Sequence, residues 1–182
     1  GMAGTLSKEN VTQSTGLRTA IVVTAAGVFD RTAESVGGVG PLTVVGGLPL
    51  FVRTVLTLQR AGLQEIVVLS GAEESELKRL LRDDPRVTVA VRWRPVREFP
   101  PDDHRTWAAL AHEANGPCLI VGAQMVMARP LIEALGREAE ADPRALTVVC
   151  DGRATEIAVL PPSLMSVSAA IKGEGPPIRV LL

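Results

Sequence analysis

The chain has 182 residues and a mass of 19.2 kDa, a length typical of one domain. Hydrophobic residues make up 46% and charged residues 21%, a balance that excludes wholesale disorder. A formal net charge of −1 and an aromatic content of 3%, with no tyrosine, give no reason to propose nucleic-acid binding.

Short aliphatic runs alternate with helical patterns after a polar N-terminal tail, residues 1–18. The expected strands are 20–24, 66–69, 87–91, 118–121, 146–150 and 156–160, with an extended piece at 41–45. The expected helices are 48–61, 72–82, 105–114, 129–141 and 163–171, and an apolar run, 178–182, closes the chain. Aliphatic strands separated by helices predict a three-layer α/β/α domain over 19–182 with a mostly parallel central sheet.

Cysteine content and hydropathy indicate the cellular compartment in which the protein is expected. Cys118 and Cys150 lie in apolar runs, which favours buried free thiols, and they are too few for a disulfide scaffold or a cysteine zinc site. No apolar stretch reaches the roughly 18 residues of a membrane span. His104 and His112 lack the spacing of a helical zinc pair, so we expect no metal site from them. The reducing cytoplasm is the expected location.

The candidate ligand-binding segments follow the strands, because ligands of open α/β sheets bind at the carboxyl ends of strands. The first strand runs into Ala25-Ala26-Gly27, whose small side chains let backbone amides approach a ligand closely. The strand at 66–69 runs into Ser70-Gly71. Neither segment is a P-loop or a dinucleotide-binding turn.

The segment 20–69 resembles the N-terminal half of the nucleotidyltransferase family. This family includes sugar-phosphate and alcohol-phosphate nucleotidyltransferases and the molybdenum-cofactor guanylyltransferase group. The matching residues are Ala25-Ala26-Gly27, Arg31, Val45-Gly46-Gly47, Pro49-Leu50, Arg53, Ala61-Gly62 and 66–71. The resemblance implies a nucleotide-diphospho-sugar transferase-like (GT-A-like) fold. Because family members usually continue further, it also implies either a compact member or a fragment truncated at its C-terminus.

The family's activity is transfer of a nucleotidyl group from a nucleoside triphosphate to a phosphorylated sugar, alcohol or cofactor, with release of pyrophosphate. The resemblance therefore implies two small-molecule partners, a nucleoside triphosphate and a phosphorylated acceptor. It places the nucleotide over 25–27, with Ser70 and Gly71 on the base side and Arg31 facing the triphosphate as the candidate catalytic residue. Mg²⁺ is implied as cofactor if the domain is active, and no cofactor otherwise.

Two substitutions remove the family's cationic machinery. The family lysine falls on Gly40, and the family's metal-binding aspartate falls on Ala123. Nucleotidyl transfer accumulates charge on the α-phosphoryl oxygens and the leaving group, and cations stabilise that charge. Vacant lysine and metal positions therefore predict weakened or lost catalysis.

Two alternatives stay open. A working enzyme would need a displaced carboxylate, for which Asp30, Glu34 and Asp151 are the candidates. A non-catalytic domain of the same fold would bind a nucleotide or serve in interaction or assembly, with Phe29 blocking the cleft where the family has a glycine.

A loop rich in arginine lies between the third strand and the next helix. Arg92, Arg94 and Arg97 suit the phosphate of an acceptor, because the guanidinium fork matches phosphate oxygens. The alternative is a surface loop anchored by Trp93 and Phe99, whose exposed apolar face would equally suit a homodimer contact. In that alternative the arginines pair with acidic neighbours, namely Glu98, Asp102 and Asp103.

Overall fold

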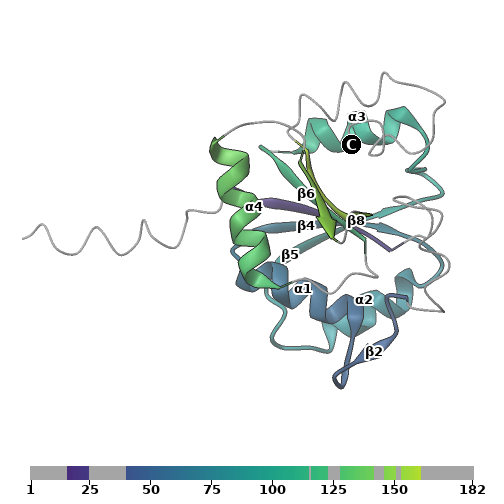
Figure 1. The fold of residues 1–182 in the computed structure, drawn as a ribbon. Coiled ribbons are helices and arrows are strands. Elements are labelled where there is room, and N and C mark those ends of the chain that lie inside the picture. Colours follow the sequence, from purple (N-terminus) through teal and green to yellow (C-terminus); the bar gives the residue numbers. More distant parts are fainter. Residues whose placement is uncertain are drawn as a thin grey trace, which may run out of the picture.

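The computed structural model describes residues 16–24, 40–114, 116–122, 128–141, 146–150 and 153–160. A six-stranded sheet forms the centre of the molecule, in the order β5-β4-β1-β6-β8-β7 (Figure 1). Its strands are β1 (Thr19–Val23), β4 (Glu65–Ser70), β5 (Ala90–Pro95), β6 (Cys118–Gly122), β7 (Leu146–Cys150) and β8 (Arg153–Leu160). The first four are parallel, β8 runs antiparallel to β6, and β7 runs antiparallel to β8. The mostly parallel sheet predicted from the sequence is confirmed.

Helices cover both faces of the sheet, which completes the predicted three layers (Figure 1). The helices are α1 (Leu50–Arg60), α2 (Glu74–Arg82), α3 (His104–Glu113) and α4 (Arg129–Ala141). The first, second and fourth pack on one face, and α3 packs on the other. The expected helix 163–171 and the run 178–182 lie outside the described residues. No helix in the described part of the chain has the length and hydropathy that a membrane crossing needs.

Burial on both faces explains why the strands read as unbroken aliphatic runs. Along β1, Ala20 and Val22 pack in the cluster beneath α1, α2 and α4. Ile21 and Val23, which point to the opposite face, pack against α3. Because successive side chains of a strand alternate between faces, the middle of a strand covered on both sides is apolar, and the buried polar residues Thr19 and Ser70 stand at strand ends.

A short hairpin precedes α1 and changes where that helix begins. Strands β2 (Val44–Val45) and β3 (Leu48–Pro49) pair antiparallel, so α1 begins at Leu50 rather than at residue 48 as predicted. Both glycines of the turn are left-handed, with φ of 61° at Gly46 and 79° at Gly47, as a tight two-residue hairpin turn requires. Arg53 Nη2 donates to the carbonyl of Val45 at 2.6 Å and ties the hairpin to the helix.

The predicted strand 87–91 is wrong in its position, because β5 spans Ala90–Pro95. The side chain of Gln59, on α1, holds the segment before β5 instead. Its amide nitrogen donates to the Arg86 carbonyl at 2.8 Å. Its amide oxygen accepts from the backbone nitrogens of Thr88 and Val89 at 2.8 and 3.0 Å. These backbone groups are therefore satisfied by a side chain and do not join the sheet.

Gln59→Leu is expected to lower the free energy of unfolding by about 0.5–1.5 kcal/mol, because it removes the three hydrogen bonds by which this side chain holds the backbone of the segment before β5. Urea unfolding followed by circular dichroism measures the change. Gln64→Leu is the matched control, since Gln64 is an exposed glutamine between α1 and β4 and is expected to change stability by less than about 0.5 kcal/mol. Equal effects of the two substitutions would contradict the role of Gln59.

Candidate functional site

The carboxyl ends of four parallel strands lie along one edge of the sheet. These strands end at Val23, Ser70, Pro95 and Gly122. Thr24 fixes the exit of β1 against β4, because both its backbone nitrogen and its hydroxyl donate to the Leu69 carbonyl, at 3.0 and 2.9 Å. Because ligands of open α/β sheets bind at this edge, it is the candidate location of the functional site.

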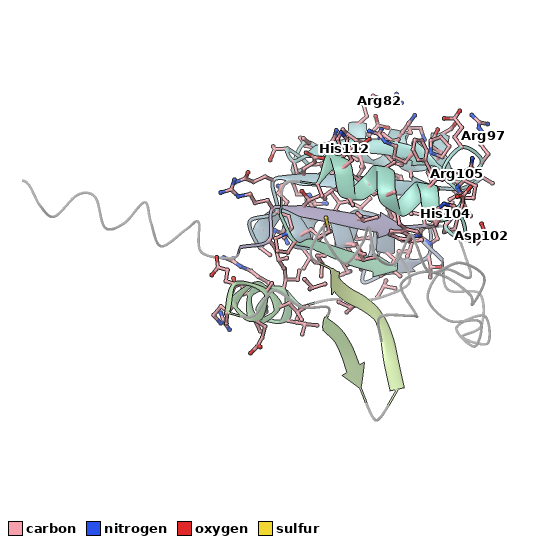
Figure 2. All side chains as sticks on the ribbon, turned by 90° about the horizontal axis from the view of Figure 1, so that it is seen from above. Arg82, Arg97, Asp102, His104, Arg105 and His112 are labelled. Carbon is pink, nitrogen blue, oxygen red and sulfur yellow. The ribbon has the colours of Figure 1, made fainter. Side chains whose placement is uncertain are left out.

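A pocket of about 390 Å³ lies at this edge, where β4 and β5 end, and we call it the β4–β5 pocket. Its volume falls in the range of ligand-binding pockets, roughly 300–1,000 Å³. Its lining residues are Ser70, Gly71, Ala72, Glu74, Ser75, Pro95, Val96 and Arg97. Figure 2 shows Arg97 at the same end of the molecule as Asp102, His104 and Arg105. The structure thus brings together Ser70, Gly71 and Arg97, which the sequence singled out separately.

Ser70 and Glu74 form the polar wall of the β4–β5 pocket. Ser70 is 1% exposed, and its hydroxyl lies 2.5 Å from Glu74 Oε1. The hydrogen bond from Ser70 lowers the pKa of Glu74, and the ammonium of Lys78 acts in the same direction. Lys78 Nζ lies 3.3 Å from Glu74 Oε2 and 5.5 Å from the centre of the Trp93 ring. Glu74 was not singled out from the sequence as a site residue, because acidic residues in the first turn of a helix ordinarily complement its dipole.

The three arginines expected in one acceptor loop separate into two groups, because Arg92 and Arg94 lie on β5 and Arg97 lies in the turn that follows it. Arg92 forms an ion pair with Glu65, and Arg94 Nη2 lies 3.0 Å from Glu113 Oε2. Both partners differ from the acidic neighbours expected for a surface loop. Arg97, by contrast, lines the β4–β5 pocket. Only one of the three candidate acceptor arginines therefore lies in this pocket.

A second pocket, of about 540 Å³, opens at the N-terminus of α3 and is lined by Pro100, Asp102, Asp103, His104 and Arg105. Asp103 is the N-cap of α3, and its carboxylate accepts from the backbone nitrogen of Arg105 at 2.9 Å. The Arg105 guanidinium, 2.7 Å from the same carboxylate, holds the pKa of Asp103 at about 2. Since this carboxylate already occupies the helix N-terminus, the second pocket is a poor anion site.

Among the other residues singled out from the sequence, the structure describes Cys118 and Gly40. Cys118 is a free, buried cysteine, as predicted, and burial raises the pKa of its thiol to about 12. At Gly40, a Cβ atom would meet no atom within 4 Å. The candidates Arg31, 25–27 and Ala123 lie outside the described residues. So do other residues weighed from the sequence, namely Phe29, Asp30, Glu34 and Asp151.

The carboxylates that the structure describes at the carboxyl edge do not fit a magnesium ion. The carboxylate of Glu74 is engaged by Ser70 and Lys78, and that of Asp103 caps α3. The five residues after β6, 123–127, contain no acidic side chain. Within the described ranges, no three histidine, cysteine or acidic residues gather as a metal site would require. Because Mg²⁺ prefers charged oxygen ligands, these described residues do not support a magnesium-dependent step.

No protein-family model matches this sequence, and no curated protein is significantly similar to it. Solved structures, however, share its fold. A nucleotidyl transfer enzyme from a Methanothermobacter species superposes with a TM-score of 0.64 at 16% identity, over 91% of this chain and 80% of that one. The 4-diphosphocytidyl-2C-methyl-D-erythritol synthase of Anaerococcus prevotii gives 0.60 at 12% identity, over 86% and 76%. The inositol-1-phosphate CTP transferase of T. maritima gives 0.53 at 14% identity, over 86% and 75%.

These neighbours define the class of fold: a mostly parallel α/β sheet of the nucleotide-diphospho-sugar transferase kind. The chain has the fold of nucleotidyltransferases, as the resemblance of its N-terminal half implied. Because the sequence identities to these neighbours are 8–16%, the similarity shows a shared fold and nothing more specific. Because one fold can host many functions, the function of this chain depends on the residues of its site.

Proposed function

We propose that this domain binds a nucleoside triphosphate at the carboxyl edge of its sheet and is related to enzymes that transfer a nucleotidyl group to a phosphorylated sugar, alcohol or cofactor. The observation that carries the proposal is the β4–β5 pocket, with Ser70, Gly71 and Arg97 in its lining. It adjoins the exit of β1, after which the sequence continues with the small residues 25–27. The similar structures include a synthase and a transferase whose names specify cytidine nucleotides.

Catalysis in this domain is proposed to be weakened or lost. Attack of an acceptor phosphate on the α-phosphorus forms one P–O bond and breaks the P–O bond to the oxygen that bridges the α- and β-phosphates, so that pyrophosphate leaves. Negative charge builds on the α-phosphoryl oxygens and on the leaving group. In this chain Arg31 is the proposed cation for the triphosphate, while Gly40 and Ala123 stand where the family has a lysine and a metal-binding aspartate. The proposed domain thus binds and orients the nucleotide, but it lacks much of the charge stabilisation that the transition state of nucleotidyl transfer needs.

Thermal shift with a panel of nucleoside triphosphates tests the binding. A ligand at 100 times its dissociation constant adds about 2.7 kcal/mol to stability, so binding raises the melting temperature measurably. Ser75→Trp, which fills the β4–β5 pocket, is expected to abolish the shift. Arg82→Trp is the matched control, because Arg82 is an exposed residue of the same helix, outside the pocket lining. A shift that survives Ser75→Trp would place the nucleotide elsewhere.

Pyrophosphate release from the same panel with Mg²⁺ tests the loss of catalysis. We expect no release above background in the presence of a mixture of sugar and alcohol phosphates. Rapid release that disappears in Arg31→Ala would contradict the weakened site and favour a working enzyme with displaced ligands. The absence of any thermal shift would contradict nucleotide binding itself.

A second candidate, an interaction or assembly domain of the same fold, is favoured by the surface of the β2–β3 hairpin. Leu42, Val44 and Val45 expose 39%, 63% and 39% of their surface, although all are aliphatic. The hairpin projects from the molecule beside α2 (Figure 1). An interaction role predicts a concentration-dependent homodimer that Val44→Lys dissociates, as measured by light scattering. A monomer at every concentration would contradict the homodimer.

A further inference from the structure

One wall of the β4–β5 pocket presents hydrogen-bond acceptors. An ionised carboxylate accepts hydrogen bonds and has no proton to give. The Ser70 hydroxyl, 2.5 Å from Glu74 Oε1, must therefore be the donor of that bond. Its proton is committed to Glu74 Oε1, and Lys78 Nζ donates to Oε2 at 3.3 Å. Because a carboxylate oxygen has two lone pairs, each Glu74 oxygen keeps one as an acceptor, as does Ser70 Oγ. The Glu74 side chain is 23% exposed, which leaves it accessible from the pocket.

Arg97 supplies donors to the same pocket. Its side chain is exposed and lines the pocket together with Glu74. It lies near enough for its positive charge to contribute to the lowered pKa of Glu74. A guanidinium donates through a planar fork and accepts nothing. A ligand that satisfies both residues needs hydrogen-bond donors toward Glu74 and acceptors toward Arg97, side by side on a flat polar edge.

Among nucleobases, guanine matches that requirement. Its N1–H and N2 amino group are adjacent donors, and O6 and N7 are acceptors next to them. Adenine and cytosine each place one amino group beside an acceptor nitrogen, and uracil places a single N–H between two carbonyls. A carboxylate facing any of these three edges would meet a repelling acceptor.

We propose that Glu74 selects guanine in a nucleotide bound at the β4–β5 pocket, accepting from N1–H and the N2 amino group while Arg97 donates to O6 and N7. The inference rests on the proposed nucleotide binding and goes further by naming the base and the residue that selects it. It gives Arg97 a role toward the base, distinct from the acceptor role considered from the sequence.

A structural role for Glu74 is the alternative, because a carboxylate in the first turn of α2 complements the helix dipole. Glu76 provides the matched control. It lies in the same turn and pairs with Arg79, as Glu74 pairs with Lys78, but it is not part of the pocket lining. Glu74→Gln and Glu76→Gln therefore remove the same charge from the same helix turn, and only the first alters the pocket.

Dissociation constants of GTP, ITP, ATP, CTP and UTP, measured by calorimetry with the full chain, test the inference. Inosine lacks the N2 amino group, so GTP is expected to bind wild type several-fold more tightly than ITP and about tenfold more tightly than the other three. Glu74→Gln is expected to weaken GTP about tenfold and to abolish the difference between GTP and ITP. Glu76→Gln is expected to keep the wild-type values.

The outcomes separate the two proposals. If wild type binds no triphosphate, both the proposed function and this inference are overturned. If it binds all five nucleotides alike, or if the GTP-to-ITP ratio is the same in Glu74→Gln as in wild type, nucleotide binding stands and the selection by Glu74 is overturned. Should Glu74→Gln prove unfolded, Arg97→Ala with free guanosine and inosine as probes serves instead. It must weaken both nucleosides, because both carry O6 and N7, and unchanged binding overturns the inference.

Discussion

Trp107→Ala is expected to lower the free energy of unfolding by about 3–5 kcal/mol, the range for removing a buried tryptophan. Trp107 is 1% exposed and is the largest fully buried side chain in the described part of the chain. It packs between α3 and the sheet, in the cluster that contains Ile21, Leu69 and Ile120. Because α3 is the described helix on that face, the cavity left by the indole would loosen the whole layer.

Trp107→Phe separates packing from hydrogen bonding. The indole Nε1 donates to the Pro101 carbonyl at 2.8 Å, and phenylalanine keeps much of the ring while removing this donor. We expect a smaller loss, about 1–3 kcal/mol, most of it from the carbonyl left without a partner. Urea unfolding of both variants measures the difference. A change below about 1 kcal/mol in Trp107→Ala would contradict the packing of α3 against the sheet.

The strands buried on both faces could be predicted from the sequence to within a residue or so. The runs 66–69 and 118–121 became β4 and β6 with small extensions, because a continuous aliphatic run has few other stable uses. The edge strand β5 was misplaced for the opposite reason. Its sequence, Ala90–Pro95, contains two arginines and a proline, which is not typical of a buried strand. It forms a strand because it pairs with its inner neighbour β4.

The location of the candidate site could be predicted from the sequence, but the set of side chains that line it could not. The rule that ligands bind at the carboxyl ends of parallel strands located Ser70 and Gly71. The rule could not separate Arg97 from Arg92 and Arg94, because the difference lies in long side chains reaching Glu65 and Glu113 across the fold. Nor could it find the role of Ser70, which donates to the side chain of Glu74, whereas the N-cap residue of α2 is Glu73.

The double substitution Gly40→Lys with Ala123→Asp is expected to raise pyrophosphate release by about 100-fold or more over wild type. Each residue restores a charge that the resemblance assigns to its position, and groups that stabilise the same transition state contribute on the order of 10²–10³-fold each. Gly40 accommodates a side chain, since a Cβ atom there meets no atom within 4 Å. Its backbone nitrogen donates to Thr43 Oγ1 at 2.9 Å, a bond that lysine keeps.

Single substitutions and a neutral pair test whether missing charge is what weakens catalysis in this chain. Residues that act as a unit in catalysis are strongly non-additive, so Gly40→Lys alone and Ala123→Asp alone are expected to gain far less than the pair. The neutral pair Gly40→Gln with Ala123→Asn has nearly the same shape and is expected to stay at the wild-type rate. Pyrophosphate release with Mg²⁺ and each triphosphate is measured for these four variants and for wild type. If the charged and neutral pairs release pyrophosphate equally, the substitutions at Gly40 and Ala123 are not what separates this chain from the active nucleotidyltransferases whose fold it shares.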